Sequence, residues 1–578
     1  MPKIDPTTLS VVWGGLVAIA EEMGVTLRST AYSEAVREGM DLSPGLFDAK
    51  GRLVAQGSFS PGHLGAMPFT VKHAMAAYAP ETPEPGDSIL LNDCFLGSGH
   101  LPDFYSITPI FYKGEIVGYA VNCAHHVDVG GVGPGSQGVE GVSDYYQEGL
   151  RILPIKHFKA GKPNEEVFKI IEANTRAPHK VIGDLKAQRN ANRVAEVRVQ
   201  ELIDIYGLDT INTCMDELIL RTEAATRHGI EQIPNGRYVF EDYLDDCGRD
   251  TDPIKLKVTA EVRDDDITFD FTGTSPQTES GMNSYINYTY AYSFFCVKCI
   301  TDPFIPQNEG GIRPIKVVAP EGCFLNPKPP AAGGARAVVC FRLCDVVLGA
   351  LAQAVPEKVV ASSGHWVNPN FGGIDPHTGR RFVCYDVILG GMGARPTVDG
   401  CDGICACFNA RNIPVEVCEN NFPLMVERVE FIQDSAGAGK YRGGTGLRKD
   451  FKFLGEQGKL MNLSDRQKFA PYGLLGAKPG TMGATILNPG LNEQVIQSKE
   501  SRNLQYDDVV SFRIPGSGGY GSPLERDPQA VLSDVLNGYV SAEKARTEYG
   551  VVIHDEPPTL NIEETERLRK HMKEEGNG

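Results

Sequence analysis

The segment 92–131 contains three histidines and three aspartates, residue types that bind divalent metals and transfer protons. Two runs within it are rich in aromatic and β-branched residues, Phe104–Phe111 and Glu115–Cys123, and these predict two strands. Lys113-Gly114 stands between them and predicts a tight turn. The segment is therefore expected to form a β-hairpin.

The predicted hairpin determines which of these side chains meet. With the turn centred between the two strands, Pro102 faces His125. His100, Asp103 and His125 then lie together at the open end. Imidazole nitrogens and a carboxylate that converge on one point are the ligands a divalent metal requires. The spacing predicts a metal site and an enzyme, and the alternative is chance clustering of residue types common in loops.

The bulk properties limit the class of protein. A length of 578 residues exceeds one ordinary hydrophobic core and predicts two or three domains. A formal net charge of −18 argues against nucleic acid or an anionic membrane surface as the main partner. No stretch approaches a transmembrane span, and the N-terminal residues lack the apolar core of a signal peptide. A cytoplasmic location is therefore expected.

The fourteen cysteines are scattered along the chain. Cys296 and Cys299 form one C-x-x-C pair inside an apolar run that is expected to be buried, and a second cluster comprises Cys401, Cys405 and Cys407. A zinc ribbon needs two such pairs at suitable spacing, which this sequence lacks. In a reducing compartment these residues are expected to be buried thiols.

Hydrophobic periodicity predicts the main elements. Helices are expected over 7–30, 69–78, 181–206, 338–354, 528–537, 542–549 and 563–575. Strands are expected at 88–91 and in a hairpin of 254–262 with 266–272. We therefore expect a multi-domain α+β protein with an N-terminal α+β metal-binding domain (1–235), a large antiparallel β-rich domain (236–526) and a C-terminal helical tail (527–578).

Several glycine-rich motifs point away from nucleotide binding. G-x-G-x-x-G occurs at Gly133–Gly138 and Gly516–Gly521, but neither copy stands between a strand and a helix. The loop Gly130–Gly138 is expected to be too polar and flexible for the core. No G-x-S-x-G elbow is present, which argues against serine hydrolase chemistry. His365 and His377 lie in polar segments and are expected at the surface.

Motifs of one family are spread over nearly the whole chain. They include Arg37-Glu38-x-x-Asp41, His63-Leu64-Gly65-Ala66-Met67-Pro68, Asn92-Asp93, His100-Leu101-Pro102-Asp103, His125-His126-x-Asp128-x-Gly130-Gly131, Gln147-Glu148-Gly149-Leu150-Arg151, Asn174-Thr175-Arg176, Arg411-Asn412-x-Pro414-Val415-Glu416 and Gly518-Gly519-Tyr520-Gly521. Together these segments resemble the hydantoinase B family, also called the B half of ATP-dependent oxoprolinases. The sequence departs from the common pattern at Cys94, at Gly97-Ser98-Gly99 and at Met392.

The resemblance implies one half of a two-component enzyme. A hydantoinase A-type subunit with an actin-like ATP site phosphorylates a carbonyl oxygen, and the B half completes the reaction at a divalent metal. By resemblance the metal ligands are Asp41, His100, Asp103 and His125; Asp41 comes from the resemblance alone. His126 and Asp128 are candidates for the general base or for orienting the ligands, and structural hydrogen bonding is the open alternative.

The implied reaction is ATP-dependent opening of a small cyclic amide: a hydantoin, 5-oxoproline or another lactam such as caprolactam. Aspartate and histidine ligands suit Zn²⁺, Mn²⁺ or Fe²⁺. ATP and Mg²⁺ belong to the partner subunit, and a hetero-oligomer such as (AB)2 is expected, with little activity from the isolated chain.

Two other functions remain open from the sequence. The first is a component of an ATP-dependent ketone carboxylase of the acetone or acetophenone type, because those enzymes resemble this family. The second is a non-catalytic scaffold with a structural metal, which a fully protein-ligated ion would support.

Overall fold

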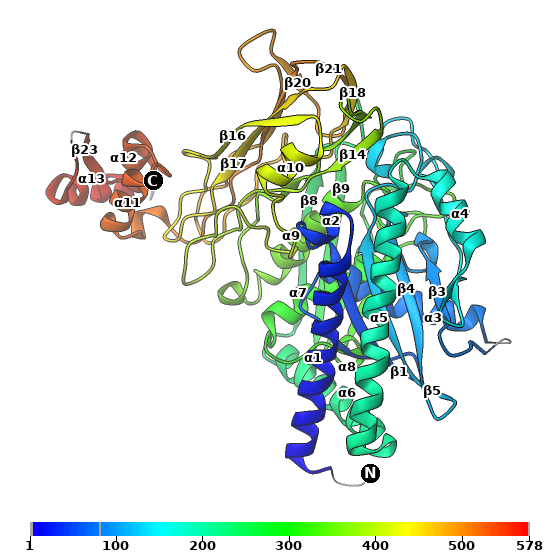
Figure 1. Ribbon diagram of the computed structural model, residues 1–578. Coiled ribbons are helices and arrows are strands. Elements are labelled where there is room, and N and C mark those ends of the chain that lie inside the picture. Colours follow the sequence, from blue (N-terminus) through cyan, green and yellow to red (C-terminus); the bar gives the residue numbers. More distant parts are fainter. Residues whose placement is uncertain (1–3, 80–81, 556, 576–578) are drawn as a thin grey trace.

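The computed structural model describes residues 4–79, 82–555 and 557–575. Helices pack against sheets that are antiparallel apart from one parallel pair, and the sheets form several separate groups (Figure 1). This arrangement confirms the α+β class and the multi-domain organisation. The predicted boundaries at residues 235 and 526 remain predictions.

A seven-stranded antiparallel sheet organises the N-terminal part, in the order β2-β1-β5-β4-β3-β6-β7. Its strands are β1 (Leu42–Asp48), β2 (Leu53–Gln56), β3 (Ser88–Leu91), β4 (Asp103–Tyr112), β5 (Glu115–His125), β6 (Ile155–Lys159) and β7 (Lys162–Pro163). Neighbouring residues of β5 enter different cores: Ala120 and Ala124 one, and Val121 and Cys123 the other. Both faces of the sheet are therefore covered.

Two long helices cover one face of this sheet, α1 (Pro6–Thr30) and α5 (Pro178–Tyr206), which run side by side in Figure 1. The other face packs on α3 (Pro61–Ala77). The predicted helix over 69–78 is only the second half of α3. Pro68 lies inside α3, and a proline ordinarily ends or kinks a helix, so the sequence predicted a start after it.

Helix α1 corrects the expectation that no stretch of the sequence approaches a transmembrane span. Among the described residues it is the one helix that is long and apolar enough, by length and composition, to cross a membrane. In this fold its apolar stripe, including Leu16 and Met23, is buried against the sheet and α5. The core helix of a folded domain passes the same test of length and composition.

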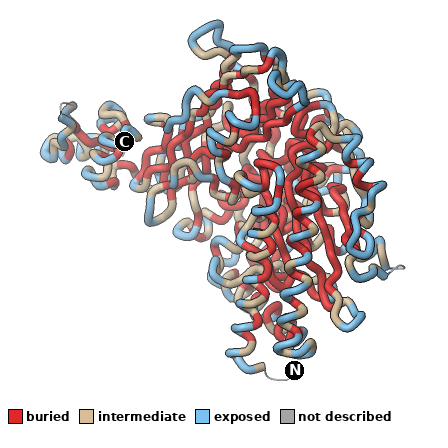
Figure 2. Tube along the Cα trace, in the orientation of Figure 1, coloured by how far each residue is buried: buried red, intermediate tan, exposed pale blue. Residues whose placement is uncertain are grey.

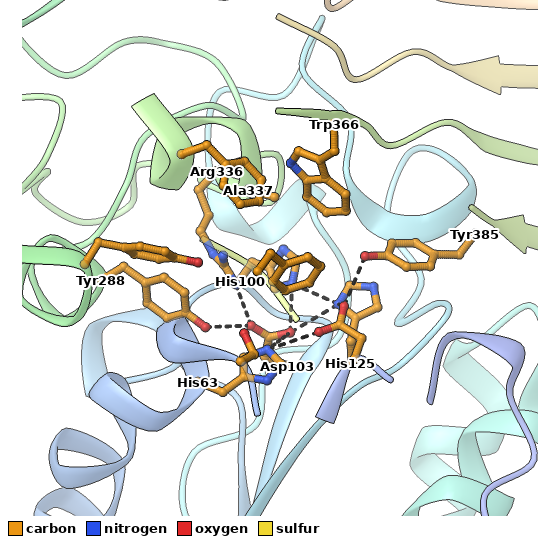
Figure 3. A pocket seen from close by; sticks show the side chains of 14 residues that line it. His63, His100, Asp103, His125, Tyr288, Arg336, Ala337, Trp366 and Tyr385 are labelled. Atoms are coloured by element: carbon orange, nitrogen blue, oxygen red, sulfur yellow. Dashed lines mark hydrogen bonds and ion pairs between the residues drawn. The ribbon is translucent and has the colours of Figure 1, made fainter. Parts of the chain in front are cut away.

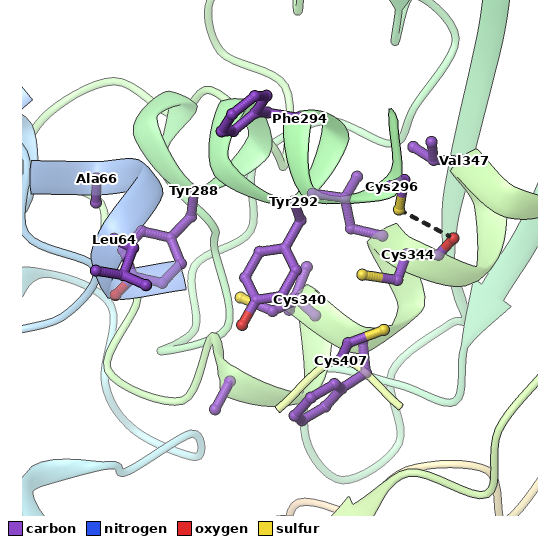
Figure 4. Close-up of a cluster of buried hydrophobic side chains, with 14 of the residues drawn as sticks. Leu64, Ala66, Tyr288, Tyr292, Phe294, Cys296, Cys340, Cys344, Val347 and Cys407 are labelled. Carbon is purple, nitrogen blue, oxygen red and sulfur yellow. Dashed lines mark hydrogen bonds between the residues drawn. The ribbon is translucent and has the colours of Figure 1, made fainter. Parts of the chain in front are cut away.

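A second, four-stranded sheet follows in the order β11-β10-β9-β8. Its strands are β8 (Gly236–Leu244), β9 (Ile254–Arg263), β10 (Asp266–Asp270) and β11 (Ile315–Val318). Helix α9 (Ala337–Leu351) packs on β8 and β9, and α7 (Ile286–Ile300) packs between α3 and α9. Figure 4 shows the resulting contact, where Leu64 of α3, Tyr292 of α7 and Cys344 of α9 share one apolar cluster. The largest core therefore contains residues from both sides of position 235.

The remaining sheets contain only short or medium strands. They are β12 (Trp366–Val367) with β15 (Ile388–Leu389); β14 (Arg381–Tyr385), β13 (Asn370–Ile374), β18 (Gln457–Met461) and β21 (Ser501–Gln505); and β16 (Leu424–Ile432), β17 (Gly446–Phe453), β22 (Val509–Arg513), β19 (Ala484–Leu487) and β20 (Gln494–Ile496). Buried phenylalanines of these sheets, including Phe371, Phe451 and Phe512, contribute to a separate core. Figure 2 shows buried residues running continuously through this part and the N-terminal part.

The chain ends in a small module that stands to one side of the body in Figure 1. It contains α11 (Pro528–Leu536), α12 (Ala542–Tyr549), the hairpin β23 (Val552–Asp555) with β24 (Pro558–Asn561), and α13 (Ile562–Glu575). The three predicted helices are confirmed, whereas the sequence did not predict the hairpin. The remaining α-helices of the described residues are the long α6 (Leu208–Glu231) and four shorter ones: α2 (Glu34–Arg37), α4 (Glu165–Asn174), α8 (Glu309–Ile312) and α10 (Val415–Asn421).

Most of the glycine-rich loop after β5 is buried, contrary to expectation, although Val132 is exposed. Residues 133–139 are all buried, against strand β13. Gly135 has a φ of +75°, and a Cβ added there would lie 2.0 Å from Asn370 Oδ1. The glycines therefore allow close packing in a conformation that other residues rarely adopt.

Candidate metal centre

The predicted hairpin forms, but with its pairing shifted by one residue. Asp103, the first residue of β4, faces His125, the last residue of β5, whereas the sequence placed Pro102 there. The shift arises between Ile110 and Phe111, where Val117 of the opposite strand has no partner. A β-bulge of this kind adds one residue to one strand. The bulge leaves the predicted grouping intact and brings Asp103 directly opposite His125.

Three side chains converge at the open end of the hairpin (Figure 3). His100 Nε2 lies 2.9 Å from Asp103 Oδ1 and 3.0 Å from His125 Nδ1. His125 Nδ1 lies 3.1 Å from the same carboxylate oxygen. All three side chains are buried. Two imidazole nitrogens and one carboxylate oxygen at mutual distances this short are a donor set suited to a divalent ion.

Hydrogen bonds at the far side of His100 and Asp103 fix the orientation of these two groups. His100 Nδ1 lies 2.7 Å from the carbonyl oxygen of Gly334, to which it donates in the neutral form. That bond leaves the lone pair on Nε2, which faces the cluster. Asp103 Oδ2 accepts from the Tyr288 hydroxyl at 3.0 Å and from Arg336 Nη2 at 2.6 Å. Oδ1 is consequently the oxygen available to an ion.

Asp41, the residue immediately before β1, reaches the same place. Leu42 pairs with Ala124, and the backbone N–H of His125 donates to the Asp41 carbonyl at 3.0 Å. Asp41 Oδ2 accepts from the Tyr385 hydroxyl at 3.1 Å. Oδ1 is buried and has no hydrogen-bond partner among the described residues. A buried carboxylate oxygen without a donor is costly, and a cation beside it would remove that cost. The residues present therefore fit a divalent metal.

His63 is a member of the cluster to which the sequence assigned no role. It lies in the first turn of α3, and its Nε2 is 3.5 Å from Asp103 Oδ1 and 3.7 Å from Asp41 Oδ1. His63, Asp103 and the buried thiol of Cys123 form a second group of possible ligands, with donor atoms within 4.8 Å of one another. The signal was present in the sequence, because His63 begins one of the family motifs.

The pKa values reflect burial and charge pairing. Burial lowers the pKa of His100 to about 4, which favours the neutral imidazole. For Asp103, burial acts to raise the pKa, but His100, His63 and Arg336 together hold it well below its ordinary value. For His63, burial acts to lower the pKa, and the nearby Asp103 and Asp41 reverse that shift and raise it. The cluster thus has an ionised Asp103 beside a neutral His100.

His126 and Asp128 lie outside this cluster. His126 Nε2 is 3.1 Å from Gln188 Oε1, and its ring packs on Phe104. Asp128 is paired with Arg176, whose Nη1 and backbone N–H each lie 2.7 Å from its carboxylate. Neither residue lines the pocket around the cluster. The structure gives both side chains structural partners, which is the alternative that the sequence left open.

The other residues singled out in the sequence divide between surface and interior. His377 is exposed, as predicted. His365 is buried, contrary to prediction, because its Nε2 lies 2.5 Å from Asp345 Oδ2 behind the pocket wall. Cys296, Cys405 and Cys407 are buried as expected, whereas Cys299 and Cys401 are exposed.

Segments far along the chain complete the walls of the pocket. They supply Tyr288, Tyr292, Arg336, Ala337, Phe341, Trp366, Tyr385 and Phe408. Because these residues carry no local spacing that links them to the hairpin, the sequence did not indicate them. The free space inside is about 20 Å³, which is room for one water molecule or ion. A larger ligand therefore requires these walls to move apart.

Two comparisons of the sequence identify relatives. The family model described as Hydantoinase B/oxoprolinase matches residues 5–523. A protein of Pseudomonas sp. (strain NS671), provisionally named as the B component of a D-/L-hydantoinase, is 36% identical over 99% of each chain. The beta chain of the caprolactamase of Pseudomonas jessenii is 33% identical over 96% of this chain and 97% of its own.

Two solved structures share the fold. The crystal structure of the ATP-dependent caprolactamase from Pseudomonas jessenii matches with a TM-score of 0.92 at 31% identity, over 98% of this chain and 100% of that chain. The nucleotide-free structure of acetone carboxylase matches with a TM-score of 0.90 at 19% identity, over 99% of this chain and 83% of that chain. At that identity the second likeness shows the fold alone.

Proposed function

This chain belongs to the hydantoinase B/oxoprolinase family, and on that premise we propose that it is the metal-dependent subunit of an ATP-dependent enzyme that opens a cyclic amide. The convergence of His100, Asp103 and His125 beside Asp41, whose Oδ1 has no hydrogen-bond partner among the described residues, is the observation that carries the proposal. These four side chains would hold the ion, which we expect to be Zn²⁺, Mn²⁺ or Fe²⁺.

The chemistry explains why two subunits are needed. An amide carbonyl is a poor electrophile because resonance places electron density on it, and O-phosphorylation opens its carbon to attack by water. For ring opening the C–N bond must then break as the nitrogen takes a proton, and a second water releases inorganic phosphate. When bound, a divalent metal supplies Lewis acidity and lowers the pKa of water. Arg336 and Tyr288 hold the Asp103 carboxylate in place, and the walls of the pocket exclude bulk water. His63, whose Nε2 faces both carboxylates, is placed to accept or return a proton.

The partner would provide the phosphorylation step. Two relatives are named as subunits, which supports a partner for this chain. We assign ATP and Mg²⁺ to a hydantoinase A-type partner, in a hetero-oligomer such as (AB)2 located in the cytoplasm. The names of the relatives support D- or L-hydantoins and caprolactam as substrates, and the family description supports 5-oxoproline.

A reconstituted complex tests the proposal. The chain, co-purified with its A-type partner and ATP, is assayed for ring opening and ADP release with hydantoin, 5-oxoproline and caprolactam. We expect metal-dependent turnover of one of these, lost in His125→Ala and retained in the surface control His377→Ala. Turnover only of acetone or acetophenone with bicarbonate would instead assign the carboxylase function. Full turnover in His125→Ala would contradict a catalytic role for the metal and would support a structural one.

A further inference from the structure

Helix α9 begins at the wall of the candidate metal pocket. Its N-cap is Arg336 and its first residue is Ala337, and both line the pocket (Figure 3). Within the described chain, the backbone N–H groups of Ala337 and Val338 have no hydrogen-bond partner. The first turn of any helix leaves such donors free, and the helix dipole places partial positive charge there. Helix N-termini bind anions for this reason.

The Arg336 side chain provides a second, independent observation. It is only 5% exposed, and its guanidinium stacks on Tyr288 at 3.8 Å from the ring centre. Nη2 is paired with Asp103, but Nη1 contacts only the Cys340 sulfur at 3.6 Å. Nε has no partner among the described residues. A guanidinium carries five donors, and a buried donor without an acceptor, such as Nε here, is costly. A ligand with several acceptor oxygens would satisfy them.

The charge of the pocket determines whether that ligand should be an anion or a cation. Its lining contains two carboxylates, Asp41 and Asp103, and one guanidinium, Arg336. Leaving the histidines aside, these three groups sum to a net charge of −1, and a divalent ion would change the sum to +1. The metal-loaded pocket therefore favours an anion.

We propose that Arg336 and the N-terminus of α9 form a phosphate receptor beside the candidate metal centre. The inference rests on the proposed function, in which the cyclic amide arrives O-phosphorylated, and it identifies the group by which this chain distinguishes an activated substrate from a neutral cyclic amide. The fork of the guanidinium and the helix amides match the tetrahedral oxygens of a phosphoryl group. The wall movement that admits the ring also admits its phosphate.

Titration of inorganic phosphate into the metal-loaded full-length chain tests the receptor. By calorimetry we expect the wild type to bind phosphate, and Arg336→Gln to bind it at least tenfold more weakly at equal metal content. Arg336→Lys, which keeps the charge but loses the fork, should fall between them. Arg380→Gln, in an exposed loop, is the matched control. Equal affinity in wild type and Arg336→Gln, or no binding by the metal-loaded wild type, overturns the proposal.

Hydrogen exchange gives a test that needs no variant. Phosphate should slow amide exchange in a peptide spanning residues 336–342 of the metal-loaded wild type, and unchanged exchange there contradicts the receptor. The proposed function is tested separately. If phosphate binding fails while the complex with its partner still opens a cyclic amide, only the receptor is wrong. If ring opening fails while phosphate binds at Arg336, the substrate assignment is wrong.

Discussion

The hydroxyl of Tyr385 donates to Asp41 Oδ2 at 3.1 Å across 344 positions of the sequence. This bond connects the β-rich C-terminal part with a candidate ligand on the N-terminal sheet. It also leaves Asp41 Oδ1 as the oxygen that faces His63 and the cluster. The candidate centre therefore depends on both parts of the chain.

Substitution of a ligand should remove the metal. We expect about one transition metal per wild-type chain, and its loss in His100→Ala and Asp103→Ala, because each variant removes one of the four proposed donors and disrupts the buried contacts among the others. Mass spectrometry of the purified proteins measures the metal content. His377→Ala is the control, since its side chain is exposed and far along the chain. Equal metal in all four proteins would contradict the ligand assignment.

Removal of the Tyr385 hydroxyl should weaken the site without abolishing it. In Tyr385→Phe the ring remains, while Asp41 Oδ2 loses its donor. Loss of such an orienting partner typically costs about 10–100-fold in metal affinity, and we expect a change of that size. Competition with a chelator of known affinity measures it. Tyr506→Phe, at an exposed tyrosine, should leave the affinity unchanged.

Asp128 should affect stability rather than metal binding. Asp128→Ala leaves the Arg176 guanidinium without its carboxylate partner. Breaking a buried ion pair in this way costs about 3–5 kcal/mol, and we expect the low end because Arg176 is partly exposed. Denaturant unfolding measures the loss, and metal content should stay at the wild-type value. Loss of metal with unchanged stability would instead support the predicted role of this residue in orienting the metal ligands.

Glu148 should make stability depend on pH. Burial raises its pKa from 4.5 to about 8, and the backbone N–H groups of Gly334 and Gly333 only partly offset the shift. The folded chain therefore retains a proton that the unfolded chain has released, so stability falls as pH rises from about 4.5 to 8. Glu148→Gln should make the unfolding free energy depend less steeply on pH. The slope should change by up to ~1.4 kcal/mol per pH unit, the value for one proton. Unfolding measured from pH 5 to 9, with Glu566→Gln as an exposed control, tests this expectation.

Gly135 and Gly141 form a matched pair for testing the buried loop. Both have positive φ, +75° and +73°, but only at Gly135 would an added Cβ collide with a neighbour, Asn370. Gly135→Ala should therefore destabilise the chain by about 1–3 kcal/mol more than Gly141→Ala. Thermal unfolding of the two variants measures the difference. Equal losses would show that backbone strain alone accounts for both.

The sequence predicted what local patterns encode. Runs rich in aromatic and β-branched residues indicated the hairpin, and its turn grouped His100, Asp103 and His125. The bulge at Val117 was not predictable, because no composition signal distinguishes an unpaired residue in a long strand. The sequence could not predict that Arg336, Tyr288 and Tyr385 line the site, since their positions follow from the packing of α7, α9 and β14. Burial of His365 and of Gly133–Val139 likewise depended on distant neighbours.

The carbonyl of Gly334 that orients His100 has a consequence for biosynthesis. A ribosome adds about 5–20 residues each second. His125 therefore emerges roughly 10–40 s before Gly334, and during that interval the imidazole of His100 has no acceptor to fix its tautomer. Tyr385 and its bond to Asp41 come later still. A metal captured by the nascent chain would meet an unfinished set of ligands, so correct metallation is expected to follow, rather than guide, the folding of the N-terminal sheet.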